Sequence, residues 1–274
     1  MKARKLAVFG NPVSHSRSPE IHDAFARQAG IDVSYDRILA PEDGFDSAVR
    51  QFVESGGIGF NVTLPFKEQA YRLVSSCSAE AETANAVNTV TVNNEGLRGD
   101  NTDGGGLVKD LSTNLDWPLA GQRVLVLGAG GAVRGVLGAL LQAEPARVDL
   151  YNRTQSRAEH LVNHFQDSRL QVCKVLRESY DLIVNGTSAG LKGESIQLPS
   201  AVVGSRTRSY DMIYGPRVTP FNAWCREQGC AAVADGLGML VEQAALSFFI
   251  WFGFNADTAP VILALRNSIN ETDV

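Results

Sequence analysis

Lys67 and Asp103 are two residues whose types suit proton transfer to and from a small substrate. Lys67 falls in the first turn after Pro65, and a lysine near the positive end of a helix loses its proton more readily. Asp103 stands before three glycines, where its simpler interpretation is an N-cap for the following helix. If the fold brings the two side chains together, they form an acid–base pair.

Several hydroxyl and amide side chains accompany this pair in the first part of the chain. Asn61 and Thr63 alternate along a predicted strand and therefore share one face of it. The loop at 14–19 carries Ser14, Ser16 and Ser18; we expect Ser18 to cap the next helix. Ser14 and Ser16 fit either turn chemistry or the binding of a small carboxylate.

A glycine-rich turn at 128–132 predicts a dinucleotide site. It joins a buried apolar strand, 123–127, to a helix expected from about Val133, and such a helix start offers free N–H groups to a pyrophosphate. Val133 occupies the position of the third glycine, so the usual pattern is incomplete. A tight strand-to-helix turn without ligand is the alternative interpretation.

The end of the next strand favours NADP over NAD. An NAD site usually carries an acid about 20 residues beyond the glycine turn, and this chain has Asn152, Arg153 and Thr154 there, followed by Arg157. A guanidinium pairs with a 2′-phosphate, which a carboxylate would repel. Arginine at a helix start is unfavourable without an anion, which argues against two ordinary surface residues.

Composition narrows the class of protein. The 274 residues are 44% hydrophobic and 20% charged, with 25 basic and 30 acidic residues and a net charge of −5. This argues against disorder and against a nucleic-acid or anionic-membrane partner. The four cysteines show no CxxC pair, and with four histidines they predict reduced thiols and no metal site. No signal segment or span is expected, which predicts a soluble, cytoplasmic protein.

Strand and helix patterns alternate along the chain, which predicts an α/β protein with parallel sheets. Expected strands include 5–9, 33–39, 57–63, 123–127, 147–151, 181–185, 209–212 and 231–234, with a hairpin at 88–101 around Asn93-Asn94-Glu95-Gly96. We expect two lobes with a cleft between them: a discontinuous substrate-binding catalytic domain, 1–102 plus 238–274, and a Rossmann-like NADP-binding domain, 103–237. The apolar stretch 244–254 reads as a buried helix.

Taken together, the motifs resemble the shikimate dehydrogenase family. They occur in order, as SxSxSP at 14–19, NVTxPFK at 61–67, ANAVNT at 84–89, GDNTDGxG at 99–106, GAGGA at 128–132, NRTxxR at 152–157, NGTSAG at 185–190, DMIYGPxxTPF at 211–221 and DGLGMLVEQA at 235–244. The set is far more specific than any one of its members.

The resemblance implies reversible, NADP-dependent reduction of 3-dehydroshikimate to shikimate, with Lys67 and Asp103 as the acid–base residues. It implies that the substrate is bound by Ser14, Ser16, Asn61, Thr63, Asn88, Tyr214 and Gln243. It implies that the cofactor is bound by Gly128, Ala129, Gly130, Gly131, Ala132, Asn152, Arg153, Thr154, Arg157, Thr187, Met212, Gly236 and Met239. The enzyme is expected to act on a small molecule as a monomer or homodimer.

Three alternatives stay open at this point. A quinate/shikimate dehydrogenase with relaxed cofactor or substrate preference is the nearest, although Asn152-Arg153-Thr154 disfavours NAD. A catalytically silent NADP-binding sensor is disfavoured by intact Lys67 and Asp103. A folate-linked dehydrogenase is disfavoured by the serine loop and the motif around Asn88.

Overall fold

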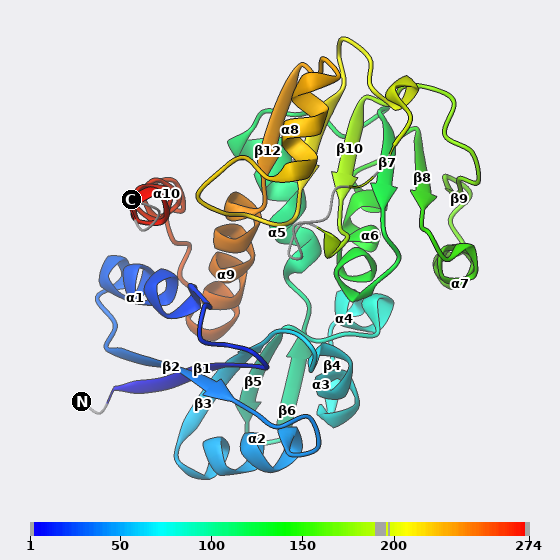
Figure 1. Cartoon of the computed structure of the whole chain (residues 1–274). Helices are drawn as coiled ribbons and strands as arrows, with labels where there is room; N and C mark the ends of the chain where they lie inside the picture. The colour runs from blue at the N-terminus through cyan, green and yellow to red at the C-terminus, as the bar shows by residue number, and fades with distance from the viewer. Residues whose placement is uncertain (1–2, 190–195, 197, 272–274) are drawn as a thin grey trace. The chain divides into compact units, whose positions relative to one another are not determined.

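A computed structural model describes residues 3–189, 196 and 198–271, and the chain divides into two compact units (Figure 1). The first unit comprises Met1–Gly106 and Val241–Val261, and the second comprises Leu107–Leu240 and Ile262–Val274. The sequence prediction assigned all of 238–274 to the first domain, whereas most of the last helix packs with the second unit. Arg266 ties this helix to the second unit: it pairs with Asp235 and donates to the Gly215 carbonyl oxygen at 2.9 Å.

The first unit holds a six-stranded mixed sheet in the order β2-β1-β3-β5-β6-β4, whose strands run from blue to cyan-green in Figure 1. Its strands are β1 (Arg4–Gly10), β2 (Val33–Leu39), β3 (Gly57–Val62), β4 (Ser76–Cys77), β5 (Thr89–Asn93) and β6 (Gly96–Asp100). Its helices are α1 (Ser18–Ala29), α2 (Phe45–Glu54), α3 (Lys67–Leu73) and α4 (Ala79–Ala84), together with most of α9 (Leu237–Phe252).

Strand alternation decides which helices cover each face of this sheet. Phe9 and Phe60 point to one side, where they form an apolar core with α2 through Phe45 and Phe52. The opposite face is covered by α1 and α9, and the Trp251 indole on α9 donates to the β5 backbone at 3.1 Å. Polar residues that alternate with the core residues of β3 therefore face α1 and α9.

The second unit has a six-stranded parallel sheet in the order β12-β11-β10-β7-β8-β9. Its strands are β7 (Arg123–Leu127), β8 (Arg147–Tyr151), β9 (Leu170–Val172), β10 (Leu182–Asn185), β11 (Arg208–Asp211) and β12 (Ala232–Asp235). Its helices are the π-helix Asp110–Asn114, α6 (Gly131–Gln142), α7 (Gln155–Phe165), the 3-10 helix Ser200–Val202, α8 (Pro220–Glu227) and most of α10 (Ala259–Glu271). Helix α5 (Asp103–Lys109) crosses the boundary, and its first residues, Asp103–Gly106, belong to the first unit.

This strand order is that of a Rossmann fold, and it has a topological switch point between β7 and β10. Apolar residues of α6 and α7, such as Leu137 and Leu161, pack on one face of the sheet with Val126. Phe221 of α8 packs with Leu125 on the other face. The predicted α/β class, with one Rossmann-like domain, is confirmed.

Most predicted elements lie within one or two residues of their expected positions, and the hairpin at 88–101 forms between β5 and β6. The apolar stretch 244–254 falls mainly within α9. Among the described residues, no helix combines the length and the apolar character needed to cross a bilayer.

Candidate active site

The predicted substrate residues of the first unit converge because four strands end or begin at one edge of its sheet. Parallel strands β1 and β3 both end there, and the serine loop and the Asn61–Lys67 segment follow them. Strand β5 runs antiparallel to β3, so Asn88, which precedes it, lies at the same edge. Asp103 follows β6 and lies there as well.

Lys67 and Asp103 meet at this edge. The Lys67 Nζ lies 2.5 Å from Asp103 Oδ2, with 21% of the lysine side chain and 8% of the aspartate side chain exposed. An ion pair shielded this far from water holds both groups in place while leaving the lysine accessible to a small molecule. The expected acid–base pair is therefore assembled, with Asp103 at the first position of α5.

Asn88 fixes the other carboxylate oxygen of Asp103. Its Nδ2 donates to Asp103 Oδ1 at 2.8 Å, and its Oδ1 accepts from the Thr102 backbone N–H at 2.9 Å. Because a carboxylate only accepts and a backbone amide only donates, these two bonds determine the orientation of the carboxamide. Gln243 Oε1 lies 3.3 Å from the same Nδ2, so this predicted substrate residue joins the group.

A buried hydroxyl cluster supports these amides. Asn61 Nδ2 lies 3.1 Å from the hydroxyls of Thr89 and Ser247, and those two oxygens lie 2.7 Å from each other. The Thr102 hydroxyl accepts from Asn88 Nδ2 at 2.9 Å and lies 3.3 Å from Ser247 Oγ. Asn61 and Asn88 are thus parts of one network, which is continuous with Asp103.

The serine loop is less enclosed, and it corrects one expectation. Ser14 is exposed and Ser16 is half-buried. Ser18 is not the cap of α1: Arg17 occupies that position, no side chain caps the helix, and Ser18 is its first residue. The Ser18 hydroxyl instead lies 3.2 Å from Ser16 Oγ, and Pro19 follows in the first turn, where proline favours helix initiation.

In the second unit, the glycine turn joins β7 to α6 with an open helix start. Gly128 has φ +105°, and a Cβ there would lie 3.2 Å from the Thr187 methyl group, so only glycine fits. A Cβ on Gly130 or Gly131 would meet nothing within 4 Å. No side chain caps α6, so its first N–H groups remain available to a phosphate. The turn therefore fits the pyrophosphate of a dinucleotide.

Val133 can take the place of the third glycine because the residue that it packs against, Gly186, is itself a glycine. A Cβ on Gly186 would lie 2.4 Å from Val133 Cγ2, so the valine methyl occupies that space. Close packing of the helix on the sheet is thus obtained with the glycine that follows β10 rather than with one on α6.

The residues predicted to bind the adenosine phosphate lie at the end of β8. Asn152 Nδ2 donates to the Thr154 carbonyl oxygen at 2.7 Å, which shapes the turn before α7. Arg153 and Arg157 are exposed, and neither pairs with a carboxylate of the described residues. Two unneutralised guanidiniums beside an uncapped helix start fit a phosphate better than they fit a free ribose hydroxyl.

The remaining predicted cofactor residues lie at or beyond the carboxyl ends of β10, β11 and β12. Thr187 follows β10, Met212 follows β11, and Gly236 follows β12 with its Cα close to the Met212 carbonyl. Met239 on α9 packs into the core of the second unit. Tyr214 also belongs to this unit, so its role toward the substrate stays a prediction. Gly190, the last residue of the 185–190 motif, lies outside the described residues.

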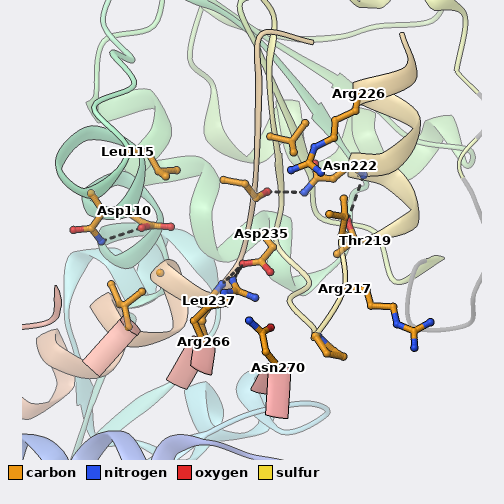
Figure 2. Close-up of a pocket in the computed structure, with 17 residues that line it drawn as sticks. Asp110, Leu115, Arg217, Thr219, Asn222, Arg226, Asp235, Leu237, Arg266 and Asn270 are labelled. Carbon is orange, nitrogen blue, oxygen red and sulfur yellow. Dashed lines mark hydrogen bonds and ion pairs between the residues drawn. The ribbon is translucent and has the colours of Figure 1, made fainter. Parts of the chain in front are cut away.

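Figure 2 shows a cavity of about 500 Å³ in the second unit, along the edge strand β12. None of its lining residues is among those predicted to bind substrate or cofactor. Two of its polar groups pair within its own wall: Arg266 pairs with Asp235, and Asn222 donates to the Ala234 carbonyl oxygen at 2.7 Å. We assign no ligand to it.

Comparison with known proteins agrees with this geometry. The family model described as the shikimate dehydrogenase substrate binding domain matches residues 8–90, the one for shikimate/quinate 5-dehydrogenase matches 110–192, and the one for the shikimate 5′-dehydrogenase C-terminal domain matches 236–266. A shikimate dehydrogenase (NADP(+)) from Alkalilimnicola ehrlichii is 53% identical over 96% of this chain and 98% of its own length. The chain belongs to the shikimate dehydrogenase family.

Solved structures support the family assignment. An Ael1 enzyme from Pseudomonas putida superposes with a TM-score of 0.92 and 41% identity, covering 96% of this chain and 98% of its own. A shikimate 5-dehydrogenase from Thermus thermophilus, solved in complex with NADP(H) and shikimate, has a TM-score of 0.88 and 33% identity over 96% and 99% of the two chains. Lys67, Asn88 and Asp103 all lie in the unit that carries the match to the family's substrate binding domain.

Four residues of the network were not singled out from the sequence: Tyr35, Thr89, Thr102 and Ser247. Thr89 and Thr102 adjoin Asn88 and Asp103, and the hairpin register could have pointed to them. Ser247 lies one helical turn after Gln243 on α9, and that spacing could have pointed to it. Tyr35 lies far from the other network residues in sequence, and only the packing of β2 brings it in.

Proposed function

We propose that this chain catalyses the NADP-dependent, reversible reduction of 3-dehydroshikimate to shikimate. The observation that carries the proposal is the Lys67 ammonium 2.5 Å from an Asp103 carboxylate whose other oxygen is held by Asn88. Family membership and the names of the close relatives, which include NADP(+) in each case, support the same reaction.

The reaction explains why an amine and a carboxylate stand together. Oxidation of shikimate removes a hydride from a secondary alcohol carbon while the hydroxyl group loses its proton; NADP, when bound, supplies the hydride acceptor. Lys67 stabilises the negative charge that develops on the oxygen, and the pair with Asp103 exchanges the proton with it. In the reverse direction the same pair returns a proton to the carbonyl oxygen.

The surrounding polar groups would orient a polyhydroxylated ring acid. Ser14 and Ser16 provide hydroxyls for the carboxylate, with Tyr214 as a further candidate. Asn61, Thr63, Asn88 and Gln243 are proposed to position the ring hydroxyls. Buried polar groups of this kind discriminate strongly against analogues that lack a hydroxyl, because such an analogue leaves them unpaired.

The cofactor is proposed to bind along the carboxyl edge of the second sheet. Residues 128–132 would receive the pyrophosphate, and Asn152–Arg157 would receive the 2′-phosphate through Arg153 and Arg157. Thr187, Met212, Gly236 and Met239 would line the nicotinamide end. We further propose that the enzyme works in the cytoplasm, as a monomer or homodimer, on a small-molecule substrate alone.

One observation favours a second candidate activity, the oxidation of quinate. The family model that matches residues 110–192 describes both shikimate and quinate dehydrogenases. The exposed arginines at the end of β8 still favour NADP for either substrate.

A single spectrophotometric experiment tests the proposal. Absorbance at 340 nm is followed with shikimate and quinate, each crossed with NADP and NAD, and kcat/KM is obtained for all four combinations. We expect shikimate with NADP to give by far the highest value. Highest turnover of quinate would establish the second candidate, and no turnover of either substrate, with tight NADPH binding, would establish a silent sensor.

A further inference from the structure

Tyr35 on β2 lies in none of the sequence motifs, yet its hydroxyl reaches the centre of the polar network. It donates to Asn61 Oδ1 at 2.7 Å. Burial raises the pKa of the Tyr35 phenol far above its ordinary value, so the group stays protonated and keeps its donor.

The ring of Tyr35 is held by a buried aromatic group. It stacks on the His22 imidazole with the ring centroids 4.5 Å apart and the planes 8° apart. His22 is fully buried and packs against Phe25 and Trp251. Burial lowers the pKa of His22 to about 3, so the imidazole is neutral at neutral pH. The phenol hydroxyl is therefore fixed in position by packing rather than by solvent.

The Asn88 carbonyl oxygen sets the orientation of the Asn61 amide, and Tyr35 holds the oxygen end of that amide. Asn61 Nδ2 points to the Asn88 carbonyl oxygen at 3.1 Å, which only accepts, so Oδ1 must face the phenol. From Asn88 the network continues to Asp103 and Lys67. Tyr35 is thus connected to the Lys67–Asp103 pair through Asn61 and Asn88.

We propose that Tyr35 is a positioning residue for the reaction, acting through Asn61. The inference rests on the proposed function. Without the Tyr35 hydroxyl, the buried Asn61 Oδ1 loses the hydrogen bond that Tyr35 donates to it, and the amide is free to turn away from Asn88.

The test is the Tyr35→Phe variant, which removes one oxygen and keeps the ring. Tyr180→Phe is the matched control: the Tyr180 hydroxyl likewise donates to a buried side-chain oxygen, Asp149 Oδ2, at 2.7 Å, but in the second unit. For wild type and both variants, kcat, KM for shikimate, KM for NADP and the melting temperature are measured. We expect Tyr35→Phe to lower kcat/KM for shikimate roughly tenfold.

Three readouts separate positioning from general destabilisation. We expect both variants to melt at lower temperature, whereas Tyr180→Phe keeps its kcat/KM and Tyr35→Phe keeps its KM for NADP. Adding Tyr35→Phe to Asn61→Ala should change kcat/KM less than about twofold, because the first residue acts through the second. Unchanged kcat/KM in Tyr35→Phe, or multiplicative effects in the double variant, would overturn the proposal. An inactive wild-type enzyme would overturn the proposed function along with it.

Discussion

Replacing Asn88 with alanine separates two possible roles of this amide, since it is predicted to bind substrate and is observed to hold Asp103. The substitution removes the donor 2.8 Å from Asp103 Oδ1 and the acceptor of the Thr102 N–H at 2.9 Å. A hydrogen bond to a charged group contributes about 1.5–3 kcal/mol. If that bond keeps Asp103 aligned in the transition state, kcat falls about tenfold to a hundredfold.

The assay is steady-state kinetics with shikimate and NADP, together with urea unfolding. Asn222→Ala is the matched control: this asparagine is also buried, donates to a carbonyl at 2.7 Å and accepts from Ser209 Oγ at 2.6 Å. We expect both variants to lose stability and only Asn88→Ala to lose kcat. A raised KM for shikimate with kcat unchanged would refute the positioning of Asp103, because the amide would then act only on bound substrate.

The remaining predictions concern pH and the cofactor. Because His22 is neutral in the folded chain down to a pKa of about 3, the unfolded chain takes up a proton below 6.5 that the folded chain does not. The stability that neutral His22 contributes is thus present above pH 6.5 and falls by about 2 kcal/mol at pH 5. Urea unfolding at pH 7 and pH 5 should show a smaller fall in the free energy of unfolding for His22→Asn than for the wild type. Equal falls would exclude His22 as the source of this pH dependence. Arg153→Ala and Arg157→Ala should each raise the KM for NADP roughly tenfold and leave the KM for NAD within about twofold; equal rises for both cofactors would exclude contact with the 2′-phosphate.

Local sequence patterns predicted the edges of both sheets where the candidate residues lie. Parallel strands end at one edge of a sheet, so the residues that follow β1 and β3 could be expected to lie close together. The Asn-Glu-Gly turn predicted the hairpin that places Asn88 and Asp103 at the same edge. The arginines after β8 stood out because an expected acid was missing.

Other features depend on contacts between distant segments and have no local signal. The role of Ser18 could not be read from its cap-like position, since its hydroxyl engages Ser16. Tyr35 enters the site only through the pairing of β2 with β1 and its stacking on His22. Asp110, the first residue of the π-helix after α5, likewise pairs far along the chain: its carboxylate accepts from Tyr210 Oη at 2.6 Å.

The most direct test of the acid–base pair is the kinetics of Lys67→Ala with shikimate and NADP. Loss of a positioned general acid–base group lowers turnover by about a hundredfold or more. We therefore expect kcat to fall at least that far, while the KM for shikimate rises much less. Turnover comparable to that of the wild-type enzyme would remove Lys67 from the chemistry and contradict the account.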